Sequence, residues 1–192
     1  MERASSVTLS IALALWLALA AVGGIAAMAI FPAAKELPLS MEGYAAFTAA
    51  EPILGRQLIA GHLVERVFIL SEVPRLVLAA IAAAAFVAQL RLGRPTAFRR
   101  LRIAAFAVAA VALLVSAFWA RPVFTAVDRK YRVLADQVEA KPEWVATAVE
   151  HKSIAVDPAH AFASRVATTE IMALLALIAL SAGAAAGATR RD

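Results

Sequence analysis

The chain has 192 residues, of which 62% are hydrophobic, and it carries a formal net charge of +5. Its mean hydropathy of +0.78 is higher than a soluble domain with a polar surface reaches, so a water-soluble enzyme or binding module is excluded. The absence of cysteine excludes disulfides, a thiolate nucleophile and a thiolate metal site.

Long apolar runs define the expected fold. They consist mostly of alanine and leucine, which favours helices over the alternating strands of a membrane barrel. Positions 4–34 hold no charged residue and exceed the apolar core of a secretory signal peptide, so we expect a first span rather than a cleaved leader. The pattern predicts an all-α, polytopic membrane four-helix bundle. Its spans are expected at about 7–31, 72–92, 103–120 and 170–189.

The second span has charged residues inside its apolar stretch. Only 15 uncharged residues run from Leu76 to Leu90. They cover roughly 22 Å of a hydrocarbon core about 30 Å thick. In one interpretation each charge reaches the headgroups separately and Pro74 begins the helix. In the other, charges at this end of the bundle form a shared outer polar cluster. Its candidate members are Glu72, Arg75, Arg121, Arg165 and Glu170.

The basic residues predict the orientation. The amino terminus, the turn at 91–102 and the carboxyl terminus together hold eight basic and two acidic residues, a charge of +6, against −1 for the remainder. Both termini are therefore expected in the cytoplasm, in a bacterial inner membrane. The turn offers candidate contacts to anionic lipid headgroups, or determines topology only. Its arginines are Arg91, Arg94, Arg99, Arg100 and Arg102. No aromatic-studded basic stripe is present, so no nucleic-acid partner is expected.

The two outward connections, about 33–71 and 121–169, are expected to be helical. Pro52 suits a first helical turn, and an apolar stripe follows it. A second, amphipathic stripe runs from Phe124 to Val138 at spacings of three and four. Asp157 before Pro158 predicts the N-cap of the last helix. We expect one integral membrane domain over residues 1–192. The first stripe comprises Ile53, Leu58, Leu63, Val64, Val67 and Phe68; the second comprises Phe124, Val127, Tyr131, Leu134 and Val138.

Residues able to carry chemistry are few. His62, His151 and His160 match no strong metal motif, so neither a metal nor a cofactor is expected. The spans offer serines without a histidine or lysine base, so no catalytic residue is assigned and the protein is not expected to be an enzyme. Two glycine pairs are candidates for close helix packing, and the second could instead form a homodimer seam. These pairs are Gly23 with Gly24, and Gly183 with Gly187.

Several segments carry a resemblance to a known family. They are "WLALAAVGGIAAMAIFP", "LIAGHLVERVF", "RPVFTAVDRKYR" and "HAFASRV", separated by spans and an arginine-rich turn. In this order they resemble the transmembrane-protein-205-like four-helix membrane family, a bacterial domain of unknown function. The resemblance implies a fold and a membrane location, and it implies no reaction.

The expected function follows from these exclusions. We expect a non-catalytic integral membrane protein that acts as an accessory or scaffolding component, with the lipid bilayer and a membrane-protein partner or a second copy as its contacts. The alternative is a small oligomeric transporter or efflux component with a polar outward vestibule. The two differ in whether the outer charges line a water-filled path or bind helices to one another.

Overall fold

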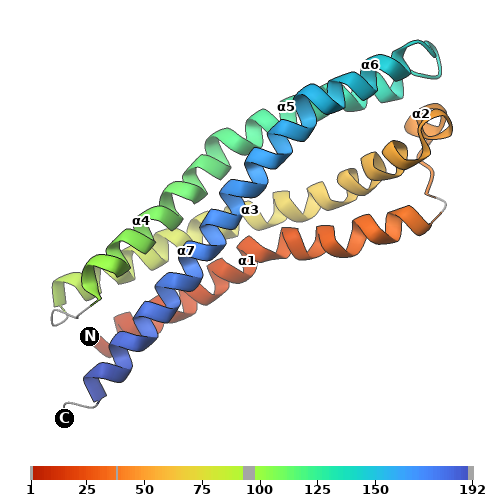
Figure 1. The fold of residues 1–192 in the computed structure, drawn as a ribbon. Helices are drawn as coiled ribbons and strands as arrows, with labels where there is room; N and C mark the ends of the chain where they lie inside the picture. Colours follow the sequence, from red (N-terminus) through yellow and green to blue (C-terminus); the bar gives the residue numbers. More distant parts are fainter. Residues whose placement is uncertain (1, 38, 93–97, 190–192) are drawn as a thin grey trace. The chain divides into compact units, whose positions relative to one another are not determined.

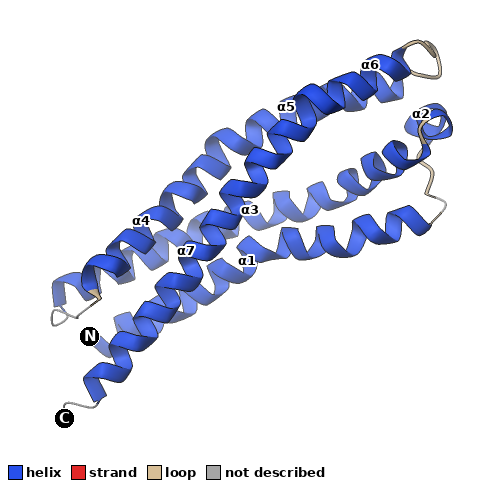
Figure 2. Ribbon diagram, viewed as in Figure 1, coloured by secondary structure: helices blue, strands red, loops and turns tan. Residues whose placement is uncertain are grey.

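The computed structural model describes residues 2–37, 39–92 and 98–189, and every regular element in that part of the chain is a helix (Figures 1 and 2). The predicted all-α class is confirmed. The α-helices are α1 (Glu2–Glu36), α2 (Ala45–Ala50), α3 (Pro52–Leu92), α4 (Arg99–Val115), α5 (Arg121–Asp136), α6 (Trp144–His151) and α7 (Asp157–Thr189). Three short segments join them, the 3-10 turn η1 (Glu42–Tyr44) and the π-helical segments η2 (Ser116–Ala120) and η3 (Lys152–Val156).

Four helical runs in the described residues are long and apolar enough to cross a membrane. They extend over Ala4–Glu36, Pro52–Arg91, Arg99–Asp136 and Trp144–Gly183. The first and third runs contain the expected spans at 7–31 and 103–120, and the second and fourth overlap most of those expected at 72–92 and 170–189. Each run is longer than the roughly 20 residues that a bilayer requires. By length and composition the chain is therefore a helical membrane protein.

Prolines decide where these helices begin and where they are irregular. Pro52 opens α3, as predicted, because a first-turn residue needs no backbone N–H. Pro74 lies inside α3, so the interpretation in which it begins a helix is wrong. The segments η2 and η3 directly precede the dipeptides that contain Pro122 and Pro158. Because proline has no N–H for the carbonyl four residues earlier, a π-helical turn accommodates the break while the helix continues.

The beginning of α7 differs from the prediction for the same reason. Asp157 has helical backbone angles, φ −62° and ψ −44°, and follows η3 without a break. An N-cap residue is normally extended, so the predicted cap at Asp157 is wrong. Its carboxylate instead pairs with the Lys152 ammonium, with Oδ1 and Nζ 2.7 Å apart. The helix is thus continuous from α6 through η3 into α7.

The chain divides into two compact units. The first comprises Met1–Val22, Leu70–Val115 and Val166–Asp192, and the second comprises Gly23–Ile69 and Ser116–Arg165. The single domain expected over residues 1–192 stays a prediction.

The first unit is built from parts of α1, α3, α4 and α7, and all four contribute to one apolar core. Trp16 of α1 is fully buried, and its ring meets Phe106 of α4 edge-on, with the ring centroids 6.2 Å apart. Phe106 stacks on Phe86 of α3 at 4.9 Å. Leu174 and Leu177 supply the α7 face. Alanines fill the remaining core positions, and small residues let membrane helices approach closely.

The second unit has a separate core around α5. Tyr131, Leu134 and Val138 are buried, and Phe124 and Val127 pack against the same cluster, so the stripe predicted for this helix is confirmed. Phe47 of α2 meets the Tyr131 ring edge-on at 5.9 Å.

The stripe predicted after Pro52 is wrong in part. Leu58 and Val64 are buried, whereas Ile53, Leu63 and Phe68 are exposed. The buried side of this part of α3 instead includes Ile59 and Ala60. The apolar face of the helix is wide, and the sequence alone did not show which part of it packs against other helices.

Candidate functional site

A buried polar triad lies in the first unit. Glu170 of α7 is fully buried, and its Oε1 accepts a hydrogen bond from the indole Nε1 of Trp16 in α1 at 2.7 Å. Its Oε2 lies 3.3 Å from Nη2 of Arg75 in α3. Arg75 is itself only 8% exposed. One carboxylate thus joins three helices of the apolar bundle.

The triad accounts for Arg75, one of the charged residues in the second span. Arg75 and Glu170 are both enclosed by protein, whereas Glu72 is half-buried. A charge inside a membrane bundle is tolerated when it pairs with an opposite charge and its remaining polar atoms find partners. The indole N–H stabilises the carboxylate by a hydrogen bond at Oε1 and the guanidinium by an ion pair at Oε2, so the carboxylate is buried and paired.

Of the five candidates for the outer polar cluster, the structure brings Arg75 and Glu170 together. Glu72 is half-buried and lies one helical turn before Arg75 in α3. Arg121 and Arg165 belong to the second unit. A cluster that includes all five residues therefore stays a prediction.

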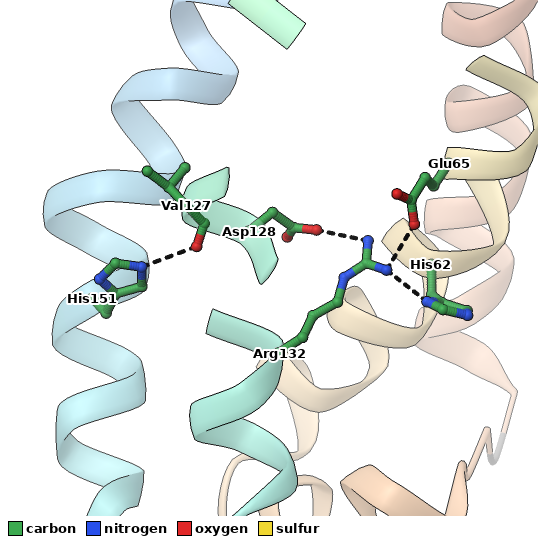
Figure 3. A network of polar contacts seen from close by, with 6 residues as sticks. All are labelled: His62, Glu65, Val127, Asp128, Arg132 and His151. Atoms are coloured by element: carbon green, nitrogen blue, oxygen red, sulfur yellow. Dashed lines mark hydrogen bonds and ion pairs between the residues drawn. The ribbon is translucent and has the colours of Figure 1, made fainter. Parts of the chain in front are cut away.

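A second polar network surrounds Arg132 of α5 in the second unit (Figure 3). Its Nη1 donates to Glu65 Oε2 at 2.7 Å and to His62 Nδ1 at 2.6 Å, both on α3. Its Nη2 pairs with Asp128 Oδ2 at 2.6 Å, one turn earlier in α5. A guanidinium can only donate, so Nδ1 of His62 is the acceptor. The guanidinium thus fastens α5 to α3 through two partners, His62 and Glu65, and is held in place by Asp128 of its own helix.

Tyr44 of η1 lies in the electrostatic field of this network. Burial raises the pKa of Tyr44, and the positive charge of Arg132 opposes that effect. The carboxylates of Asp136, Asp128 and Glu65 raise the pKa further. The phenol of Tyr44 therefore remains neutral at physiological pH.

The histidines do not converge on a shared site. His151 donates from Nε2 to the Val127 carbonyl at 3.0 Å (Figure 3). The His160 ring lies 5.7 Å from the Phe124 ring, and His62 is bound to Arg132. Among the residues the structure describes, no group of three or more His, Asp or Glu side chains could hold a metal ion. That the protein carries no metal or cofactor stays a prediction.

The arginine-rich turn contains two kinds of residue. Arg102 is buried, donates from Nη2 to Gln89 Oε1 at 2.6 Å, and lies over the Phe86 ring at 5.4 Å from its centroid. Arg99 is exposed and donates to the Leu90 carbonyl at 3.3 Å. Arg91 and Arg100 are exposed, and Arg94 lies outside the described residues.

The candidate packing glycines differ in their surroundings. A Cβ at Gly23 would meet the Phe68 ring of α3, so a larger residue there would require that ring to move. Gly24 and Gly183 face open space. The surroundings of Gly187 lie outside the described part of the chain. A packing or homodimer role for these three stays a prediction.

The sequence indicated the charged residues of the triad better than it indicated which residues they contact. Trp16 was not singled out, although an indole N–H in the middle of an apolar span needs an acceptor and so signals a buried polar partner. His62 and Glu65 lie three apart, and Asp128 and Arg132 lie four apart, so each pair shares a helix face. These spacings mark the two faces, but the pairing of α3 with α5 is not encoded in either helix alone.

Comparison with known proteins finds no match: no family model, no curated protein and no solved structure is similar to this chain. Membership of the transmembrane-protein-205-like family therefore stays a prediction that depends on the segments quoted above.

Proposed function

We propose that this protein is a non-catalytic accessory or scaffolding component of a bacterial inner membrane, with both termini in the cytoplasm. The observation that supports this role most is the Trp16–Glu170–Arg75 triad, whose carboxylate is occupied by partners from two other helices. An ion-coupled transporter needs a carboxylate that exchanges protons or ions with water during its cycle. A carboxylate that is fully buried, hydrogen-bonded to one helix and ion-paired with another is suited instead to holding helices together.

The orientation in this proposal follows from the +6 charge of the inner flanks. The lipid-facing surface of the first unit is the surface available to a membrane partner. Exposed apolar residues lie on its helices, including Met172 and Leu175 of α7 and Val111 and Leu114 of α4. A scaffold would use one of these faces and leave the other in contact with lipid.

Photo-cross-linking in cells tests the proposal. A photoreactive amino acid is placed at Met172, at Leu175, at Val111 and at Leu114, one position at a time. A discrete protein adduct that forms from one helix face and not from the other supports an accessory role. Equal adducts from both faces, or adducts with lipid only, would count against it.

Reconstitution tests the transporter alternative. The purified protein in liposomes should drive no solute-dependent proton or ion flux. Flux that is lost in a folded Glu170→Gln variant, and retained in the exposed-residue control Glu139→Gln, would overturn the proposal in favour of transport.

A further inference from the structure

Arg102 is a buried cation that pairs with no carboxylate among the side chains that the structure describes. It is 8% exposed, and its two identified contacts, the Gln89 amide oxygen and the Phe86 ring, are both neutral. Its Nε is buried without a hydrogen-bond partner. Burying an unpaired charge is strongly unfavourable, so the site requires an anion that the described part of the chain does not supply.

The sequence places few carboxylates near Arg102. Positions 73–127 contain no acidic residue. Among the acidic side chains that the structure describes in the first unit are Glu72 and Glu170, and Glu170 is bound to Arg75. Glu72 precedes Gln89 on α3 by a helical distance of roughly 25 Å. By the sequence, the flanks expected at this end carry eight basic residues against two acidic ones, Glu2 and Asp192, so the end that holds Arg102 is strongly basic.

A second arginine lies beside the first. Arg99 is one turn earlier on α4, and its guanidinium donates to the carbonyl of Leu90, the residue after the Gln89 that holds Arg102. Arg99 is exposed and forms no ion pair within the residues described. The contacts therefore hold two guanidinium groups against adjacent residues of α3, one exposed and one enclosed.

We propose that Arg102 and Arg99 form a binding site for the phosphate of an anionic phospholipid. Guanidinium groups present forked N–H donors that match phosphate oxygens. Arg102 immediately precedes the apolar run that starts at Ile103, which places the two cations at the headgroup level of a bilayer. The inference depends on the membrane location and goes beyond the accessory role, because a lipid can bind whether or not a protein partner exists.

The test uses the purified full chain in detergent, with added lipid quantified by native mass spectrometry. Phosphatidylglycerol is compared with phosphatidylcholine and with inorganic phosphate. The wild type should retain phosphatidylglycerol roughly fivefold to tenfold better than phosphatidylcholine. Arg102→Gln should abolish that preference, because glutamine keeps a polar side chain but not the charge. The matched control Arg129→Gln removes an exposed arginine of the second unit and should leave the preference unchanged.

Three results would overturn the site. The first is an unchanged lipid preference in Arg102→Gln. The second is equal retention of both lipids by the wild type. The third is saturation by inorganic phosphate alone, which would assign the site to a free anion. If Arg102→Gln does not fold, Arg102→Lys and Arg99→Gln provide the comparison, since each should lower the preference without removing every charge. Because no partner protein is present, failure here is distinct from failure of the accessory role.

Discussion

Neutralising either member of the Arg75–Glu170 pair should destabilise the protein strongly. The loss of stability in the double variant should be much smaller than the sum of the two single losses. In Glu170→Gln the Arg75 guanidinium remains 8% exposed without its counter-charge, and in Arg75→Gln a fully buried carboxylate remains. Breaking a buried pair from one side costs about 3 to 5 kcal/mol. Polar contacts between membrane helices are often worth less, about 0.6 to 2 kcal/mol, because the unfolded helices in the membrane find other partners.

The burial in this structure favours the upper part of that range, because no water reaches Glu170 to replace a lost partner. We expect each single variant to lose about 3 kcal/mol of unfolding free energy. The loss in the double variant should exceed that of either single variant by no more than about 1 kcal/mol. For a chain of this size, a loss of about 3 kcal/mol lowers Tm by roughly 6 to 12 °C.

Thermal unfolding in detergent, followed by circular dichroism, measures all three variants against the wild type. The control is Glu139→Gln, an exposed carboxylate of the second unit. Additive losses of less than about 0.5 kcal/mol would show that each charge is solvated separately, and the buried triad would then be refuted.

Three further predictions test other parts of the molecule. Because the chain lacks cysteine, single cysteines at Arg99 and Lys141 can be labelled in intact cells with an impermeant maleimide; only position 141 should react, and labelling at 99 alone would invert the topology. Purified protein should contain no stoichiometric metal or haem by elemental and absorbance analysis, and one equivalent that disappears in a His151→Ala, His160→Ala variant would contradict this. Arg132→Gln should lower stability by about 1 to 3 kcal/mol, since Arg132 holds charge-assisted bonds at 2.6 to 2.7 Å, with Arg132→Lys intermediate; no change in Tm would show that the network is too solvated to matter.

The sequence was most informative about elements whose pattern is local. Uncharged runs located all four spans, and the spacing from Phe124 to Val138 identified the buried side of α5 correctly. The prediction at Asp157 failed because a proline is equally compatible with a first turn and with a π-helical segment. Which one forms depends on whether the preceding residues remain helical, and here α6 continues through η3.

Contacts between helices were harder to predict, because each one depends on the relative rotation of two elements. Arg75 was recognised as a charge out of place, with Glu72 on its own helix as the nearest partner in sequence. The structure pairs Arg75 with Glu170, a residue 95 positions away. Nothing in either local pattern specifies that α3 and α7 meet at this level. The unassigned indole of Trp16 was the strongest available clue, because it needed an acceptor at the same depth.

The cost of the triad indicates what it contributes. Replacing a buried ion pair with apolar residues of similar volume is often neutral or stabilising, so stability alone does not account for the triad. The core around it is rich in alanine, and alanine faces permit neighbouring helices to slide by a turn with little loss of packing. A directional contact from Trp16 and Arg75 to one carboxylate penalises every other register. We therefore expect a double variant, Arg75→Met with Glu170→Leu, to keep its free energy of unfolding within about 1 kcal/mol of the wild type while losing a unique alignment of α1, α3 and α7. Disulfide trapping between cysteines introduced along α3 and α7 measures that alignment: several registers should be trapped in the apolar variant and one in the wild type, whereas a single register in both would show that packing alone sets it.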